Sequence, residues 1–167
     1  LGVVFYLVSR PGPATGLPTW TAQGDLLYAV NAGHGEFPKI VLAPGSQQES
    51  FSMAVEALNL AAKFNIPVIL LSDKFISESG ASLANLSEIK SKIFRSAKPI
   101  PGTPGDEYMA NSYEHDSYGF ATEDSKMVQK NVADRLKLIE KIKNYVPKPM
   151  FFGGKIAKKL IISWGSV

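Results

Sequence analysis

The chain has 167 residues, of which 45% are hydrophobic and 20% charged, so it is long enough for one ordinary core and shows no bias towards disorder. Its formal net charge is +3 and it contains no cysteine, which excludes disulfides, thiolate catalysis and iron–sulfur ligation by this chain. The longest apolar runs are strand-sized and far short of the roughly 20 residues that span a bilayer, so we expect no membrane segment. The absence of cysteine fits a cytoplasmic protein, which is the localisation that we expect.

The first predicted strand leads into a rigid loop. Residues 2–8, GVVFYLV, form a continuous apolar and β-branched run, which predicts a strand buried on both faces and delivers Arg10 to a sheet edge. Several prolines and glycines follow, and they fix φ, remove backbone donors and permit unusual backbone angles. We expect Thr19 or Thr21 to cap a helix whose first turn carries Asp25.

Two further strands alternate with a helix. Residues 39–43 and 66–72 are short apolar runs, and between them Ser46 stands three residues before Glu49, which is a capping box. The helix predicted over 46–64 places six apolar side chains on one face: Phe51, Ala54, Val55, Leu58, Ala61 and Ala62. This alternation predicts an α/β fold, an open and mostly parallel sheet with flanking helices.

The second half of the chain predicts a linker, a helical arm and the beginning of another domain. Residues 98–105, KPIPGTPG, alternate proline with glycine and exclude regular structure, whereas a helix begins near 122–124 and continues at helical spacing to Pro147. A last apolar run, 160–164, predicts a strand with no crossover after it, so both ends look cut and we interpret the chain as a fragment. We expect three parts, which are residues 1–80, the linker and arm 81–155, and the start of a second α/β domain at 156–167.

Few residues form a recognisable catalytic set. The two histidines, His34 and His115, lack metal-binding spacing, and His34 either titrates near a ligand or hydrogen-bonds the last turn of its own helix. Glu114 and Asp116 flank His115, which suggests either acid–base work or a capped turn. Basic residues outnumber acidic ones after Ser125 and form either a solvated face or a surface for an acidic partner. Nucleic acid is not expected there, since no aromatic residues alternate with the lysines.

Arg10 is the exception. At the end of a strand, before a loop rich in glycine, its guanidinium would be partly desolvated and would need an anion, for which a carboxylate fits bidentately. The alternative is a salt bridge to an acidic residue of the same domain.

A longer pattern extends over the chain. The residues SRPGPATGLPTWTAQGDLLYAVNAGHGEFPKIVLAPG, then IPVILLSDKFISES and YEHDSYGFATED, resemble the α subunit of 2-oxoacid:ferredoxin oxidoreductases, the 2-oxoglutarate type in particular. The resemblance implies a thiamin diphosphate-binding fold in which residues 1–80 are the C-terminal part of the pyrimidine-side domain. It also implies that a complex decarboxylates a 2-oxoacid oxidatively, forms an acyl-coenzyme A and passes the electrons to ferredoxin. By the same resemblance, this chain would be inactive alone. Ala22 is a departure, because the family frequently has an acidic residue there.

The same resemblance implies roles for the loop. Arg10 would lie near the substrate carboxylate, and Thr15 with Gly16 beside both the cofactor and the substrate. The glutamate that activates the aminopyrimidine is expected upstream of Leu1. Thiamin diphosphate with Mg²⁺ would be shared with a β subunit, and an iron–sulfur cluster would lie only on a partner chain; ferredoxin and coenzyme A would be partners of the complex. The alternative function is an anion- or nucleotide-binding α/β module without redox chemistry.

Overall fold

In a computed structural model the chain forms two compact units, which are described separately. One unit comprises Leu1–Arg95 with Val146–Val167, and the other comprises Ser96–Tyr145. The structure describes residues 2–82, 94, 102–105, 107, 109–154, 156 and 158–167, so the linker predicted over 98–105 lies partly outside the described residues. Among the helices of these residues, none is both long and apolar enough to cross a membrane.

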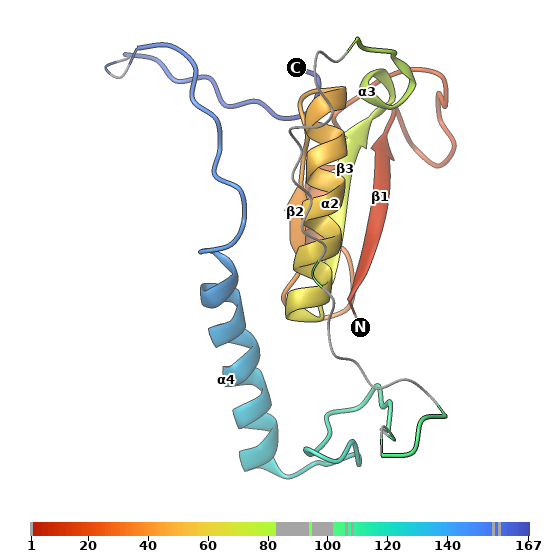
Figure 1. The fold of residues 1–167 in the computed structure, drawn as a ribbon, viewed down its shortest axis with the longest axis vertical. Helices are drawn as coiled ribbons and strands as arrows, with labels where there is room; N and C mark the ends of the chain where they lie inside the picture. Colours follow the sequence, from red (N-terminus) through yellow and green to blue (C-terminus); the bar gives the residue numbers. More distant parts are fainter. Residues whose placement is uncertain are drawn as a thin grey trace. The chain divides into compact units, whose positions relative to one another are not determined.

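The first unit is built on a three-stranded parallel sheet (Figure 1). Its strands are β1 (Val3–Ser9), β2 (Ile40–Leu42) and β3 (Pro67–Asp73), in the spatial order β1-β3-β2. β3 pairs in parallel with both neighbours, so the chain crosses over between strands through helices. The predicted strands, their parallel pairing and the open α/β sheet are confirmed.

Helix α2 (Gln47–Phe64) packs along the sheet, against β3 and β1. Ser46 Oγ accepts a hydrogen bond from Glu49 N at 3.2 Å, and the Glu49 carboxylate accepts one from Gly45 N at 2.7 Å. The predicted Ser46 cap is therefore confirmed, whereas the Glu49 carboxylate reaches the N–H of Gly45, one residue before the N-cap, and not that of Ser46 as a capping box requires. Asn65 ends the helix in the left-handed conformation.

The buried side of α2 is rotated from the predicted one and shares only Ala61 with it. Its buried residues are Ala57, Leu60, Ala61 and Phe64, whereas Phe51 is 50% and Leu58 60% exposed. The helix carries apolar residues on more than one side, and only the side that faces the sheet is buried. Sequence periodicity detects an apolar side but does not say which of two sides meets the sheet.

Strand β1 also differs from the prediction. It lies at an edge of the sheet, and its side chains Phe5 and Tyr6 are 55% and 54% exposed. The strand buried on both faces is β3, which lies in the centre and is buried from Val68 to Asp73. Both runs have the composition of a buried strand, and the spatial order decides which of them is central.

Two short helices follow the loop and the last strand. α1 (Leu26–Asn31) begins after Asp25, whose side chain forms no capping hydrogen bond, so capping by Thr19 or Thr21 is a wrong prediction. The loop continues irregularly to residue 25, which places both threonines outside the helix. α3 (Lys74–Glu78) follows β3 directly.

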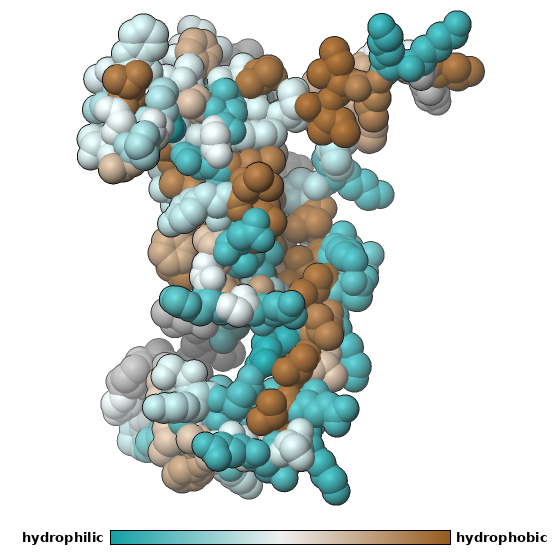
Figure 2. All heavy atoms as spheres, turned by 180° about the vertical axis from the view of Figure 1, so that it is seen from behind, coloured by the Kyte–Doolittle hydropathy of each residue, from teal (hydrophilic) through white to brown (hydrophobic). Residues whose placement is uncertain are grey.

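The second unit contains helix α4 (Ser125–Ile142), which confirms the predicted helical arm. The Asp124 side chain caps it by accepting a hydrogen bond from Met127 N at 2.8 Å. Figure 2 shows a hydrophobic stripe along one side of this helix, where the exposed apolar side chains are Val132, Leu136 and Ile139.

The strand predicted over 160–164 is absent. These residues are irregular, and Leu160, Ile161 and Ile162 are 71%, 90% and 86% exposed. An apolar run becomes a strand only when a neighbour pairs with its backbone, and the described residues provide none here. Trp164 instead packs against the cluster of Ala29, Ile69 and Leu71 in the first unit. The beginning of a second domain at residue 156 stays a prediction.

Candidate functional site

The carboxyl ends of β1 and β3 lie at the same end of the sheet, near the C-terminus of the chain (Figure 1). Ser9 of β1 lies opposite Asp73 of β3, and both residues are fully buried. Ser9 is followed by Arg10 and its loop. Ligands of open α/β sheets bind outside the carboxyl ends of the strands, so this end is the candidate site.

The loop after β1 folds back on Arg10. Arg10 Nε donates a hydrogen bond to the Thr15 carbonyl at 3.1 Å, and Leu17 N donates one to the Pro11 carbonyl at 3.0 Å. Gly16 has a φ of +54°, and a Cβ at this position would lie 1.9 Å from the Pro11 carbonyl oxygen. Only glycine permits this close approach, so the turn requires Gly16.

Arg10, Thr15 and Gly16 therefore share one turn, and all three are exposed. The expected partial desolvation of Arg10 is not present, because the described residues leave the loop uncovered. Within the described part of the chain, Arg10 forms no ion pair, which leaves its two terminal guanidinium nitrogens without an acidic partner. Its Nε is held by the backbone while the planar fork of the side chain stays accessible to a carboxylate.

Asp73 connects three segments at this end of the sheet. Its Oδ1 accepts a hydrogen bond from Ile76 N at 2.9 Å, and its Oδ2 accepts from Gln23 Nε2 at 3.1 Å and from Ser166 N at 2.8 Å. Burial acts to raise the pKa of Asp73, but the hydrogen bonds from Ile76, Ser166 and Gln23 outweigh it, so the pKa lies below its ordinary value. Asp73 is thus a carboxylate at neutral pH.

Asp73 follows the run 66–72 directly, but no sequence pattern indicated this cluster. Gln23 and Ser166 lie 50 and 93 residues away in the sequence, and neither belongs to a motif that would have indicated the contact. Ser9 was also missed as a site residue. Its buried Oγ has no hydrogen-bond partner among the described residues, so this edge holds a hydroxyl that a water or a polar ligand atom could satisfy.

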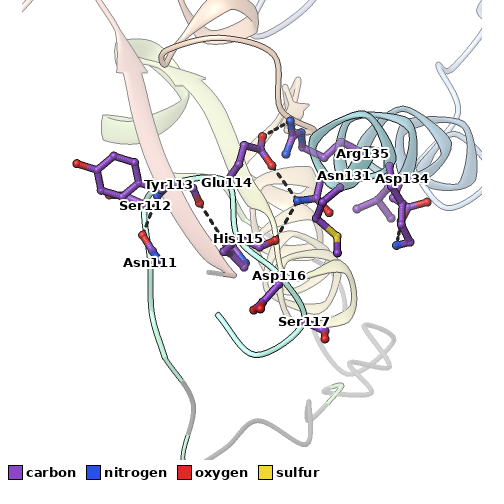
Figure 3. Close-up of a pocket in the computed structure, with 13 residues that line it drawn as sticks. Asn111, Ser112, Tyr113, Glu114, His115, Asp116, Ser117, Asn131, Asp134 and Arg135 are labelled. Carbon is purple, nitrogen blue, oxygen red and sulfur yellow. Dashed lines mark hydrogen bonds and ion pairs between the residues drawn. The ribbon is translucent and has the colours of Figure 1, made fainter. Parts of the chain in front are cut away.

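A second polar cluster joins residues 111–117 to α4 (Figure 3). Glu114 accepts hydrogen bonds from Arg135 Nη2 at 2.6 Å and from Asn131 Nδ2 at 2.9 Å. The hydrogen bond from Arg135 is the main cause that holds the pKa of Glu114 below its ordinary value. These residues line a cavity of about 700 Å³ within the second unit.

The neighbours of Glu114 form a turn rather than an acid–base set. Asp116 Oδ1 accepts hydrogen bonds from the backbone N–H groups of Tyr118 and Phe120, and His115 Nδ1 lies 2.9 Å from the Tyr113 carbonyl oxygen. The capped-turn interpretation is therefore confirmed for Asp116, and the two carboxylates have different partners. The other histidine, His34, is exposed. In the described parts of the chain no three His, Cys, Asp or Glu side chains gather closely enough to hold a metal ion.

Comparisons with known proteins agree on one family. Residues 1–134 match the family model described as pyruvate flavodoxin/ferredoxin oxidoreductase, thiamine diphosphate-binding. The chain is 35% identical to 2-oxoacid:ferredoxin oxidoreductase 2, subunit alpha, of Aeropyrum pernix, over 98% of this chain and 29% of that protein. It is 41% identical to 2-oxoglutarate synthase subunit KorA of Archaeoglobus fulgidus, over 60% of this chain and 30% of that protein.

A solved structure shows the same fold. It is the 2-oxoglutarate:ferredoxin oxidoreductase from Magnetococcus marinus with 2-oxoglutarate, coenzyme A and succinyl-CoA bound. Its TM-score with this chain is 0.79 at 28% identity, over 87% of this chain and 29% of that one, which confirms the predicted thiamin diphosphate-binding fold. The chain spans about 30% of the length of the curated relatives it matches. With its fold, its Arg10 loop and most of its length matched, the chain belongs to the thiamine diphosphate-binding family of the pyruvate flavodoxin/ferredoxin oxidoreductases.

Proposed function

We propose that this chain is part of the α subunit of a cytoplasmic 2-oxoacid:ferredoxin oxidoreductase. The complex would decarboxylate a 2-oxoacid oxidatively, form an acyl-coenzyme A and pass the electrons to ferredoxin. As substrate we propose 2-oxoglutarate, which the names of the Archaeoglobus relative and of the Magnetococcus structure support for those proteins. The complex would also contain a β subunit.

The observation that supports this proposal most directly is the set of contacts that Arg10 makes and leaves open. Its Nε is fixed by the Thr15 carbonyl, and its terminal nitrogens have no acidic partner in the described residues. A 2-oxoacid presents a carboxylate beside its reactive carbonyl. A guanidinium held in this way would bind that carboxylate bidentately and orient the carbonyl, at the end of the sheet where such folds bind ligands.

Thiamin diphosphate is the cofactor expected for the family, and the residues present fit one part of it. Thr15 offers an exposed hydroxyl and Gly16 an exposed backbone without a side chain, both next to Arg10. We propose that these two residues contact the cofactor and the substrate, and that the β subunit supplies the diphosphate and Mg²⁺ site. We propose that an iron–sulfur cluster lies on the partner chain; the 167 residues of this chain contain no cysteine to ligate one. When bound, thiamin diphosphate supplies the carbanion chemistry, and this chain supplies binding and orientation.

The alternative, an anion- or nucleotide-binding module without redox chemistry, would use the same loop. The match of residues 1–134 to the oxidoreductase family favours the first function. Isothermal titration separates the two: the proposed enzyme binds thiamin diphosphate only when the β subunit is present, whereas the module would bind a mononucleotide by itself.

The experiment that tests the proposal is Arg10→Ala in the assembled enzyme. We expect kcat/KM for the 2-oxoacid to fall roughly 30- to 1000-fold, because the substrate carboxylate loses its charged partner. This corresponds to a loss of about 2 to 4 kcal/mol in transition-state stabilisation. Arg10→Lys should restore only part of the loss, since an ammonium lacks the planar fork. The affinity for thiamin diphosphate should not change, and the Tm should fall by at most a few degrees, because Arg10 is exposed and loses only its hydrogen bond to the Thr15 carbonyl.

Lys39→Ala is the matched control. Lys39 is also a cation whose side chain donates to a backbone carbonyl of the same unit, that of Val30 at 3.1 Å, but it lies outside the Arg10 loop. This variant should keep normal kcat/KM. If Arg10→Ala assembles, binds the cofactor and turns over normally, Arg10 does not belong to the site.

A further inference from the structure

We propose that Asp73 is a positioning residue for the Arg10 loop, which it holds through Gln23 and through the C-terminal segment that contains Ser166. This inference rests on the proposed function of Arg10. The side chain of Asp73 accepts hydrogen bonds from Gln23, Ser166 and Ile76 among the described residues, and not from Arg10, Thr15 or Gly16. Its effect on the substrate would therefore pass through the loop that it anchors.

Both ends of the loop are attached to the same residue of β3. The loop begins after Ser9, which lies opposite Asp73 in the sheet, and it ends near Gln23, whose amide donates to Asp73 Oδ2 at 3.1 Å. Residues 12–21 between these ends are exposed, so packing against the described residues contributes little to their position. The placement of the loop therefore depends on its ends, and the polar contact at the far end is made by Asp73.

The C-terminal segment completes this anchor. Ser166 N donates to Asp73 Oδ2 at 2.8 Å, and Ser166 Oγ lies 3.3 Å from Gln23 Nε2, so the Gln23 amide is held from two sides. Gly165 is buried with a φ of +70°, and a Cβ there would lie 2.9 Å from Asp73 Oδ2. The backbone approaches the carboxylate this closely because residue 165 is glycine.

The chemistry requires a carboxylate at residue 73. Its two oxygens accept three N–H donors, and an ionised carboxylate is acceptor-only. An asparagine at this position keeps the shape and one carbonyl oxygen, but its amide nitrogen would face a donor. If the amide nitrogen replaces Oδ1, the contact with Ile76 N is lost; if it replaces Oδ2, the contacts with Gln23 and Ser166 are both lost. An asparagine therefore cannot cap α3 and hold the loop at the same time.

The test uses Asp73→Asn and Gln23→Leu in the full-length α subunit assembled with its β subunit. We expect either variant to lower kcat/KM for 2-oxoglutarate by about 10- to 100-fold, because a displacement of about 1 Å at a substrate-orienting group costs up to about 100-fold. The Kd for thiamin diphosphate should stay within about 3-fold of the wild-type value, as expected when most cofactor contacts lie elsewhere.

A double-mutant cycle separates positioning from simple stabilisation. If Asp73 acts through Arg10, then Asp73→Asn should reduce kcat/KM less than about 3-fold further in an Arg10→Ala background, although the two residues do not touch. The shifts in Tm caused by the two substitutions should be additive. A residue that only stabilises the fold would lower the Tm and leave kcat/KM of the assembled enzyme unchanged, in either background.

Asp124→Asn is the matched control, because Asp124 also caps a helix through its carboxylate but lies in the other unit. It should keep normal kcat/KM. The proposal is overturned if Gln23→Leu, which leaves the Asp73 cap of α3 intact, has normal kcat/KM, or if the losses from Asp73→Asn and Arg10→Ala multiply fully. Normal kcat/KM in Arg10→Ala would refute the proposed role of Arg10, and absence of 2-oxoacid turnover in the assembled wild-type enzyme would refute the proposed function. Each failure is therefore seen in a different sample.

Discussion

Gly16→Ala is the sharpest test of the geometry of the Arg10 loop. Gly16 has a φ of +54°, and an alanine Cβ would lie 1.9 Å from the Pro11 carbonyl oxygen, whereas real Cβ contacts essentially never fall below 3.0 Å. The turn must therefore open by about 1.1 Å, the difference between these two distances. This movement separates Pro11 from Leu17 and shifts the carbonyl of Thr15, to which Arg10 is bonded.

The cost to stability should be modest and the cost to activity large. A left-handed residue with a Cβ costs roughly 1–2 kcal/mol, and the loss of one hydrogen bond costs about 0.5–1.5 kcal/mol. The loop is exposed and the core is untouched, so the Tm should fall by only a few degrees. A shift of about 1 Å in the group that orients the substrate should lower kcat/KM about 100-fold.

Two glycines provide matched controls for the assay, which is steady-state kcat/KM of the assembled enzyme beside its Tm. Gly35→Ala introduces a Cβ at a φ of +67° with no atom within 4 Å, so it reproduces the backbone strain without the overlap. Gly12→Ala lies in the same loop, also with no atom within 4 Å. Both should keep kcat/KM within a factor of about 3. If Gly16→Ala behaves like either control, the turn does not position Arg10, and the reasoning is refuted.

Three further predictions concern stability and titration. Ser46→Ala removes the hydroxyl that caps α2 and should cost about 1 kcal/mol, a decrease of a few degrees in Tm by calorimetry, with no effect on substrate affinity. Because the pKa of Asp73 is lowered in the folded state, its stabilisation is fully present above the pKa of an unfolded aspartate, about 3.9, and is lost as the pH falls through the folded value. Urea unfolding should therefore show the wild type and Asp73→Asn converging in stability below about pH 4, and a constant difference down to pH 2 would contradict this. In Arg135→Met, a ¹³C NMR titration should find the pKa of Glu114 returned towards its ordinary value, whereas an unchanged titration would show that Arg135 is not the main cause of the shift.

Much of the fold is readable from short-range patterns. The strands at β1, β2 and β3 are local apolar runs, and the start of α2 depends on Ser46 and Glu49, three residues apart. The patterns that predict these elements involve residues close in the sequence, so they can be recognised without knowledge of the tertiary fold. The same holds for the capped turn at Asp116, whose partners are two and four residues away.

Apart from the capping of α1 by Thr19 or Thr21, which fails because the irregular loop continues to residue 25, the wrong predictions concern contacts between distant segments. Phe5 and Tyr6 are exposed because β3, and not β1, occupies the centre of the sheet. The run at 160–164 has strand composition but no pairing partner among the described residues. Burial and strand pairing are properties of the neighbours that a segment meets, and composition alone does not specify them.

The candidate site also has one feature that depends on local sequence and one that depends on contacts between distant segments. The sequence by itself determined the turn that joins Arg10, Thr15 and Gly16, because these residues lie within one short loop whose prolines and glycines restrict the backbone locally. Only the tertiary structure decided that this loop is anchored to Asp73, since Gln23 and Ser166 lie 50 and 93 residues from it. The physical reason is that a buried carboxylate takes whichever donors the folded chain brings to it, and those donors leave no periodic mark in the sequence.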